Sequence, residues 1–99
     1  FIKDGKQVTG GNELYQNYPN PFDARTVIGL NLAEEGKGTL NLFDVTGRII
    51  KSVQKSWTKG YQEVLIDRQD IGVSGVLYYR FESSFFTSSR KMVLIDEKN

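Results

Sequence analysis

The side chains that could carry chemistry in this sequence are carboxylates, hydroxyls and arginines, because it contains neither cysteine nor histidine. Those two absences exclude disulfides, thiolate and imidazole metal sites, and the Ser-His-Asp and Cys-His arrangements of nucleophilic catalysis. Asp67 and Asp70 could still act together as acid and base, or help to bind calcium. Asp-Arg-Gln-Asp lacks the glycine and the distal glutamate of an EF-hand loop, however. We therefore expect Asp67 to end a strand and Asp70 to form an Asx-type turn.

Serine and glycine motifs give no better catalytic candidate. Without histidine, a serine nucleophile would need a lysine base, and Ser-Ser-Arg-Lys has no recognisable nucleophile elbow around it. The serines are therefore expected on a solvated hairpin: Ser83, Ser84, Ser88 and Ser89. Gly72–Gly75 lacks the Gly-Lys-Ser/Thr ending of a phosphate-binding loop, and no helix is predicted after it. The sequence thus predicts no catalytic residue, no cofactor site and no metal site, and we do not expect an enzyme.

Aromatic side chains are a second possibility, because an exposed cluster of them can form a platform for sugar rings. The candidates for such a platform are Trp57, Tyr61, Tyr15, Tyr18 and Tyr78. Trp57 and Tyr61 also fit a structural role, in which they flank a turn and cover one end of the core. The arginines could form an anion-binding patch, but interleaved acidic residues favour a mixed surface around Arg25, Arg48, Arg80 and Arg90.

Length and charge limit the remaining classes of function. The 99 residues suit one domain, and 38% hydrophobic with 25% charged residues suits a packed core. The sequence has 13 lysine and arginine residues and 12 aspartate and glutamate residues, so its net charge is +1. This balance gives no electrostatic attraction toward nucleic acid or an anionic membrane. No apolar run approaches the ~20 residues of a membrane span, so we expect no membrane insertion. The chain opens at Phe1 without a signal peptide, so we expect a fragment or a processed product.

The elements that must position any functional residue are strands. Residues 1–12 are polar and glycine-containing and are expected to form a linker or a frayed first strand, followed by one domain over residues 13–99. Period-two alternation and turn residues predict strands over residues 13–18, 26–32, 39–45, 48–53, 61–67, 76–82 and 91–95, with a turn over residues 85–90. About seven strands at regular spacing indicate an all-β fold, an immunoglobulin-like antiparallel β-sandwich without the Cys–Trp–Cys core.

Two turns carry distinctive residues. Pro19-Asn20-Pro21-Phe22 cannot lie in a central strand, because each proline lacks an N–H, and it predicts a fixed elbow with Phe22 in the core. Gly47 is expected at a positive φ in the hairpin that joins residues 39–45 to 48–53. Arg48 is expected either to pair with Asp44 or to belong to a recognition surface.

Several motifs in order resemble one family. They are Leu14–Phe22 followed by Thr26–Ile28, the hydrophobic–aromatic–Asp–x–x–Gly–Arg hairpin Leu42–Arg48, Gly60–Val64, the strand Gly75–Arg80, and the closing segment Arg90–Ile95. This series resembles the type A C-terminal sorting domain of the type IX secretion system, although Asp23 stands where the family usually has asparagine. The resemblance marks Pro19, Asn20, Pro21, Phe22, Gly47, Arg48 and Gly75 as structural motif residues.

The resemblance implies a function in secretion. Members are C-terminal domains that carry an upstream cargo of the same chain through an outer-membrane translocon. A surface sortase then cleaves off the domain, and the cargo is released or attached to the surface. It therefore implies export by way of the periplasm to the cell surface or medium, with the translocon and sortase as partners. The segment implied in recognition is the closing strand: Lys91, Met92, Val93, Leu94 and Ile95. A monomer without a cofactor is expected.

Alternation along the closing strand predicts which side chains are free. We expect Met92 and Leu94 to face the core, because Lys91 then reaches solvent without burying its charge. The backbone edge of this strand and Lys91 are then expected to be available to a partner by strand addition. The alternative function is a structural or carbohydrate-binding accessory sandwich within a cell-surface protein or a hydrolase.

Overall fold

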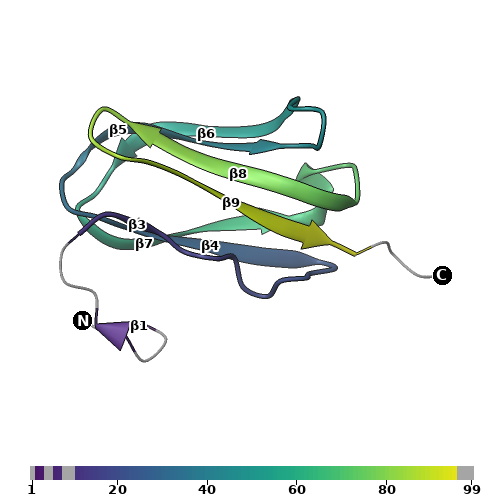
Figure 1. Ribbon diagram of the computed structural model, residues 1–99, viewed down its shortest axis with the longest axis horizontal. Coiled ribbons are helices and arrows are strands. Elements are labelled where there is room, and N and C mark those ends of the chain that lie inside the picture. The colour runs from purple at the N-terminus through teal and green to yellow at the C-terminus, as the bar shows by residue number, and fades with distance from the viewer. Residues whose placement is uncertain (1, 4–5, 8–10, 96–99) are drawn as a thin grey trace.

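Seven strands form two facing antiparallel sheets in the computed structural model, which describes residues 2–3, 6–7 and 11–95 (Figure 1). The three-stranded sheet has the order β3-β4-β7, and the four-stranded sheet has the order β6-β5-β8-β9. The strands are β3 (Glu13–Leu14), β4 (Arg25–Leu32), β5 (Gly36–Phe43), β6 (Ile49–Trp57), β7 (Gly60–Asp67), β8 (Gly75–Ser83) and β9 (Thr87–Leu94). This architecture confirms the all-β, immunoglobulin-like sandwich.

The segment expected to be a linker or a frayed strand is only partly described. β1 (Ile2–Lys3) and β2 (Lys6–Gln7) pair with each other in a small antiparallel sheet of their own. The rest of residues 1–10 lies outside the described residues. The domain boundary at residue 13 stays a prediction.

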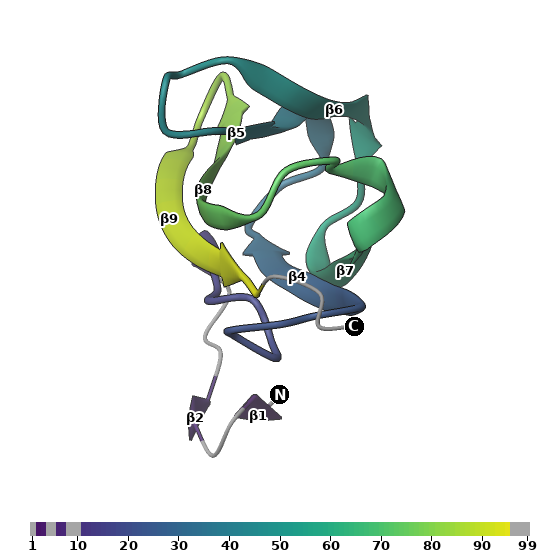
Figure 2. The ribbon, with the colours of Figure 1, turned by 90° about the vertical axis from the view of Figure 1, so that its right-hand side faces the viewer.

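The core lies between the two sheets, where the period-two alternation placed it. β4 contributes Ile28, Leu30 and Leu32, each at most 1% exposed. β5 and β8 contribute the following side chains, all fully buried: Leu40, Leu42, Leu77, Tyr79 and Phe81. The two sheets stack as layers, and β9 curves along one side of them (Figure 2). Burial of these large apolar side chains is the main stabilising contribution in a chain without disulfides.

Several predicted boundaries on the four-stranded sheet are wrong, and β5 covers Gly36–Phe43 where residues 39–45 were expected. β9 begins at Thr87, whereas a turn was expected over residues 85–90. The actual turn is tighter, because the Ser83 N–H bonds to the Phe86 carbonyl at 2.9 Å and the chain reverses at once. Ser and Thr dominate the first half of β9, so that part of the strand shows no hydrophobic alternation.

β6 continues to Trp57, whereas this strand was expected to end at residue 53. Its side chain is 2% exposed, its indole N–H donates to the Gly38 carbonyl at 2.9 Å, and its ring meets Phe81 edge-on at 5.3 Å. The expectation that Trp57 covers one end of the core is therefore confirmed. The same burial removes Trp57 from the sugar platform.

The first strand is shorter than residues 13–18, because the chain leaves the regular ladder after Leu14. Tyr18 still forms an isolated antiparallel bridge to Val27. Between them the Asn17 amide is buried and donates to the Pro19 carbonyl at 3.1 Å and to the Thr26 hydroxyl at 3.0 Å. These bonds fix the approach to the proline segment, in which the Tyr18–Pro19 and Asn20–Pro21 peptide bonds are cis.

Candidate recognition surface at the closing strand

The carboxylates considered for catalysis have separate structural roles. The Asp67 side chain accepts a hydrogen bond from the Gln69 N–H at 3.2 Å and caps the 3₁₀ turn η1 (Arg68–Asp70). Asp67 thus ends its strand as expected, but it also makes the Asx-type contact expected of Asp70. Asp70 instead pairs with Lys51 at 3.7 Å. Among the described residues, no three His, Cys, Asp or Glu side chains gather as a metal site would require.

The Gly47 turn forms as the sequence predicted, with φ of +89° at Gly47. The Asp44 carboxylate accepts from the Thr46 N–H at 2.9 Å, the Thr46 hydroxyl at 2.6 Å and the Arg48 N–H at 3.1 Å. The Thr46 hydroxyl bond, followed by the bonds from the two backbone N–H groups and the Arg48 charge, holds the pKa of Asp44 below its ordinary value against a raising effect of desolvation. Arg48 pairs with Asp44 at 3.2 Å, which is the first of its two expected roles. Gly75 also has a positive φ, +104°, where β8 begins.

The arginines lie on a mixed surface, as expected, because three of the four named ones pair with carboxylates. Arg25 pairs with Asp67 at 3.6 Å and Arg80 with Glu82 at 3.9 Å. The Arg90 guanidinium donates to the Leu14 carbonyl at 2.7 Å, which ties β9 to β3.

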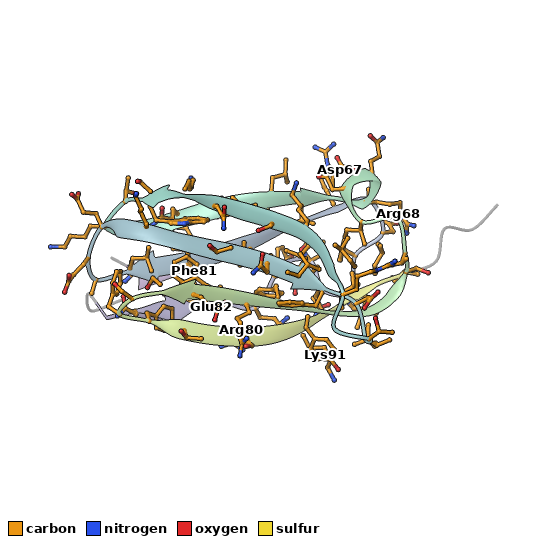
Figure 3. All side chains as sticks on the ribbon, turned by 90° about the horizontal axis from the view of Figure 1, so that it is seen from above. Asp67, Arg68, Arg80, Phe81, Glu82 and Lys91 are labelled. Carbon is orange, nitrogen blue, oxygen red and sulfur yellow. The ribbon has the colours of Figure 1, made fainter. Side chains whose placement is uncertain are left out.

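Along β9 the predicted division of faces is confirmed. Met92 and Leu94 are buried in the core, at 0% and 1% exposure, while Lys91 is exposed and points away from the sandwich (Figure 3). The closing segment therefore combines two functions in alternate residues. The buried pair fixes the strand in the sheet, and only Lys91, Val93 and Ile95 present side chains outward.

The outer backbone edge of β9 is already occupied, contrary to the expected free edge. The Val93 N–H donates to the Asn20 side-chain oxygen at 2.9 Å, and the Val93 carbonyl accepts from the Phe22 N–H at 3.0 Å. The Ile95 N–H donates to the Phe22 carbonyl at 2.9 Å. Since a sheet edge with bonded N–H and C=O groups cannot accept another strand, addition at residues 93–95 is blocked in the folded domain.

Two further side chains bond to backbone carbonyls on either side of Val93. The Gln16 amide donates to the Lys91 carbonyl at 2.6 Å. The Arg68 guanidinium donates to the carbonyl oxygens of Ile95 and Asp23. We call the segment Gln16–Phe22 the clamp; in Figure 2 it lies in dark blue beside the yellow β9. The clamp joins the two ends of the sequence that carry the family motifs.

A buried tyrosine anchors the clamp to the core. The Tyr79 hydroxyl donates to the Tyr15 carbonyl at 2.6 Å and accepts from the Asn17 N–H at 2.8 Å. Burial raises the pKa of Tyr79 to about 12, although the Asn17 bond acts in the opposite direction. Phe22 lies at the other end of the clamp, 2% exposed, and fills the core as expected.

The surface left open beside β9 is partly apolar. Val76 lies directly opposite Val93, and Tyr78 opposite Lys91. Val76 is 37%, Tyr78 43% and Ile95 44% exposed. We call this surface the β9 face and define it as Val76, Tyr78, Lys91, Val93 and Ile95. A hollow of about 400 Å³ lined by Val45, Val73 and Val76 adjoins it. Contiguous exposed apolar side chains next to a charged one are typical of protein–protein contact sites.

Sequence reasoning missed the clamp contacts of Gln16, Asn20 and Arg68. The one available signal was Asn20 itself, a side chain with both hydrogen-bonding functions in a segment where the flanking prolines have no N–H. The partner of that side chain, Val93, is far away in the sequence and contributes only backbone atoms.

The fold and this surface define a small all-β domain, an immunoglobulin-like sandwich with a partly apolar outer face along β8 and β9. The chain belongs to the secretion system C-terminal sorting domain family, whose model matches residues 16–95. The match begins at the clamp and ends at Ile95, so it encloses both partners of the clamp contacts. No curated protein and no solved structure matches the chain. Among the described residues, no helix has the length and apolarity needed to cross a membrane.

Proposed function

We propose that the domain carries an upstream cargo of the same chain through the type IX outer-membrane translocon, by way of the periplasm, and that a surface sortase then cleaves it or attaches the cargo. Membership of the sorting-domain family supports export to the surface or medium. The route, the cleavage and the partners are the proposal. The clamp is the observation that best supports this proposal, because its hydrogen bonds hold the closing strand in the sheet with one face exposed.

Recognition is assigned to the β9 face and not to the edge of β9. Lys91 supplies a positive charge that stays solvated, and the apolar side chains beside it, Tyr78 and Val93, supply area to bury. Met92 and Leu94 act indirectly, since they hold β9 against the core. Lys91, Val93 and Ile95 are thus the residues of the closing segment that a translocon component would touch.

Deleting the end of the chain cannot test this assignment, because removal of Met92 and Leu94 would also open the core. A fusion experiment tests the sorting function of the domain as a whole. The whole chain is joined behind a fluorescent protein with an export signal and expressed in a host with a type IX system. We expect this fusion to reach the cell surface and a control fusion without the domain not to reach it. Retention in the periplasm together with binding to a glycan array would support the accessory sandwich instead.

A further inference from the structure

A groove of about 640 Å³ lies between the clamp and the three-stranded sheet, and none of its lining residues belongs to the β9 face. Three of the side chains that line it are aromatic: Tyr15, Tyr18 and Tyr61. These are the tyrosines of the predicted platform that the fold brings together, since Trp57 is buried and Tyr78 lies on the β9 face. The groove is thus the place where this domain gathers exposed aromatic surface.

Gly29 on β4 is one of the residues that line the groove. A Cβ atom at Gly29 would come within 2.5 Å of the Tyr61 hydroxyl oxygen, so the Tyr61 ring lies directly over this glycine. The Tyr15 N–H bonds to the Gly29 carbonyl at 2.9 Å, and the Tyr15 and Tyr61 rings meet edge-on at 5.9 Å. On the neighbouring strand Glu63 is directly opposite Gly29. The Tyr61 hydroxyl donates to the Glu63 carboxylate at 2.9 Å and so orients it at the groove.

The charge of the groove is negative. Among the described residues that line it, Glu63 is the one charged side chain, and there is no lysine or arginine. None of the ion pairs formed within the described part of the chain includes Glu63. Arg25, on the same face of β4, is paired with Asp67 at 3.6 Å.

The amide side chains around the groove are engaged in the fold. Gln16 donates to the Lys91 carbonyl, Asn17 donates to Pro19 and Thr26, and Asn20 accepts from Val93. Sugar recognition combines stacking with several polar groups, and these amides are committed elsewhere. A carboxylate beside tyrosine rings is instead the chemistry that attracts a cation.

We infer that this groove binds a lysine or arginine side chain on an extended peptide of a partner protein. The cationic head lies between the tyrosine rings and the Glu63 carboxylate. A volume of about 640 Å³ is far larger than one ammonium or guanidinium group, so the flanking peptide occupies the rest, along Tyr18 and the prolines. The inference goes beyond the proposed function and fails or stands separately from it, because the groove shares no residue with the β9 face.

The test is a titration of the full chain, labelled with ¹⁵N, with acetyl-Gly-Arg-Gly-amide and with the same peptide carrying neutral citrulline. Amide shifts at Gly29, Tyr61 and Glu63 are expected with the arginine peptide and much smaller shifts with citrulline. Glu63→Gln keeps an acceptor for the Tyr61 hydroxyl and removes the charge, and it should weaken binding by about threefold or more. Glu34→Gln, at an exposed glutamate outside the groove, is the matched control and should leave binding unchanged.

A second variant separates the aromatic contribution from the charge. Tyr18→Ala removes an 81% exposed side chain and should also weaken binding of the arginine peptide without unfolding the domain. The inference is overturned by equal binding of the two peptides or by unchanged affinity in Glu63→Gln. It is also overturned if no amide resonance shifts at the highest concentration of the arginine peptide. Binding of a neutral oligosaccharide in the groove instead of the peptide, or shifts on dilution that reveal a second copy of the chain, would overturn it as well.

Discussion

Replacing Tyr79 with phenylalanine removes one oxygen atom and should loosen the clamp. The ring is completely buried and stays in place, so the change leaves no large cavity. What is lost is the hydroxyl that donates to the Tyr15 carbonyl and accepts from the Asn17 N–H. Because Asn17 is buried, water cannot easily replace that bond.

The expected cost is about 2–3 kcal/mol of unfolding free energy. A buried group left without its hydrogen-bond partner costs about 1–3 kcal/mol, and here one buried N–H and one carbonyl lose theirs. Tyr78→Phe is the matched control, since its side chain is 43% exposed and should change stability by less than about 0.5 kcal/mol. Urea denaturation of both variants measures the difference.

The same side chain makes stability depend on pH in the alkaline range. Burial raises the pKa of Tyr79 to about 12, whereas an unfolded tyrosine titrates near ~10. Between these values the unfolded chain loses the proton first, so the contribution of Tyr79 is complete below pH ~10 and is lost as the pH rises to about 12. The loss is on the order of 2 kcal/mol in the native chain and should be absent from Tyr79→Phe. A variant as stable as the native chain at neutral pH, with the same alkaline loss, would refute the anchoring role of Tyr79.

Three further changes test other parts of the fold. Phe22→Ala should lower the free energy of unfolding by about 3–5 kcal/mol, because it empties a core site where the native side chain is only 2% exposed. Tyr18→Ala, at an 81% exposed side chain, should cost little. Similar costs for the two variants in thermal or urea unfolding would contradict the core assignment of Phe22. Gly47→Val should lower stability by more than about 1 kcal/mol, because a β-branched residue is strained at φ of +89°, and an unchanged melting temperature would contradict the turn geometry. Asn20→Ala should speed hydrogen exchange at the Val93 amide with little effect on the rest of β9, and unchanged protection there would show that the clamp bond does not form.

The sandwich was predictable because apolar residues recur at every second position along the strands. Ile28, Leu30 and Leu32 alternate with a glycine and an asparagine, and Leu77, Tyr79 and Phe81 alternate with a tyrosine and an arginine. Both sets are buried as predicted. Where the alternation is weak the prediction failed, as in the first half of β9, which is held by pairing to β8 and not by hydrophobic contrast.

The clamp was not predictable because its bonds join distant residues through atoms that leave no pattern. Asn20 binds a backbone N–H, and Phe22 binds the backbone of Val93 and Ile95. Any residue other than proline at those closing positions offers the same backbone groups, so only the three-dimensional arrangement identifies them. The resemblance identified both segments as family motifs, and the hydrogen bonds between them now give a structural reason for both to occur in one domain.

The central claim is that the sorting signal is read from the β9 face. The most direct measurement is the fraction of a fluorescent cargo delivered to the surface of a type IX host by the double variant Lys91→Ala, Val93→Thr, compared with Lys59→Ala at an exposed lysine outside that face. Stability of both purified domains is measured in parallel and is expected to stay within about 0.5–1 kcal/mol of the native domain. The account predicts strongly reduced delivery by the double variant and normal delivery by the control. Normal delivery by both would contradict it.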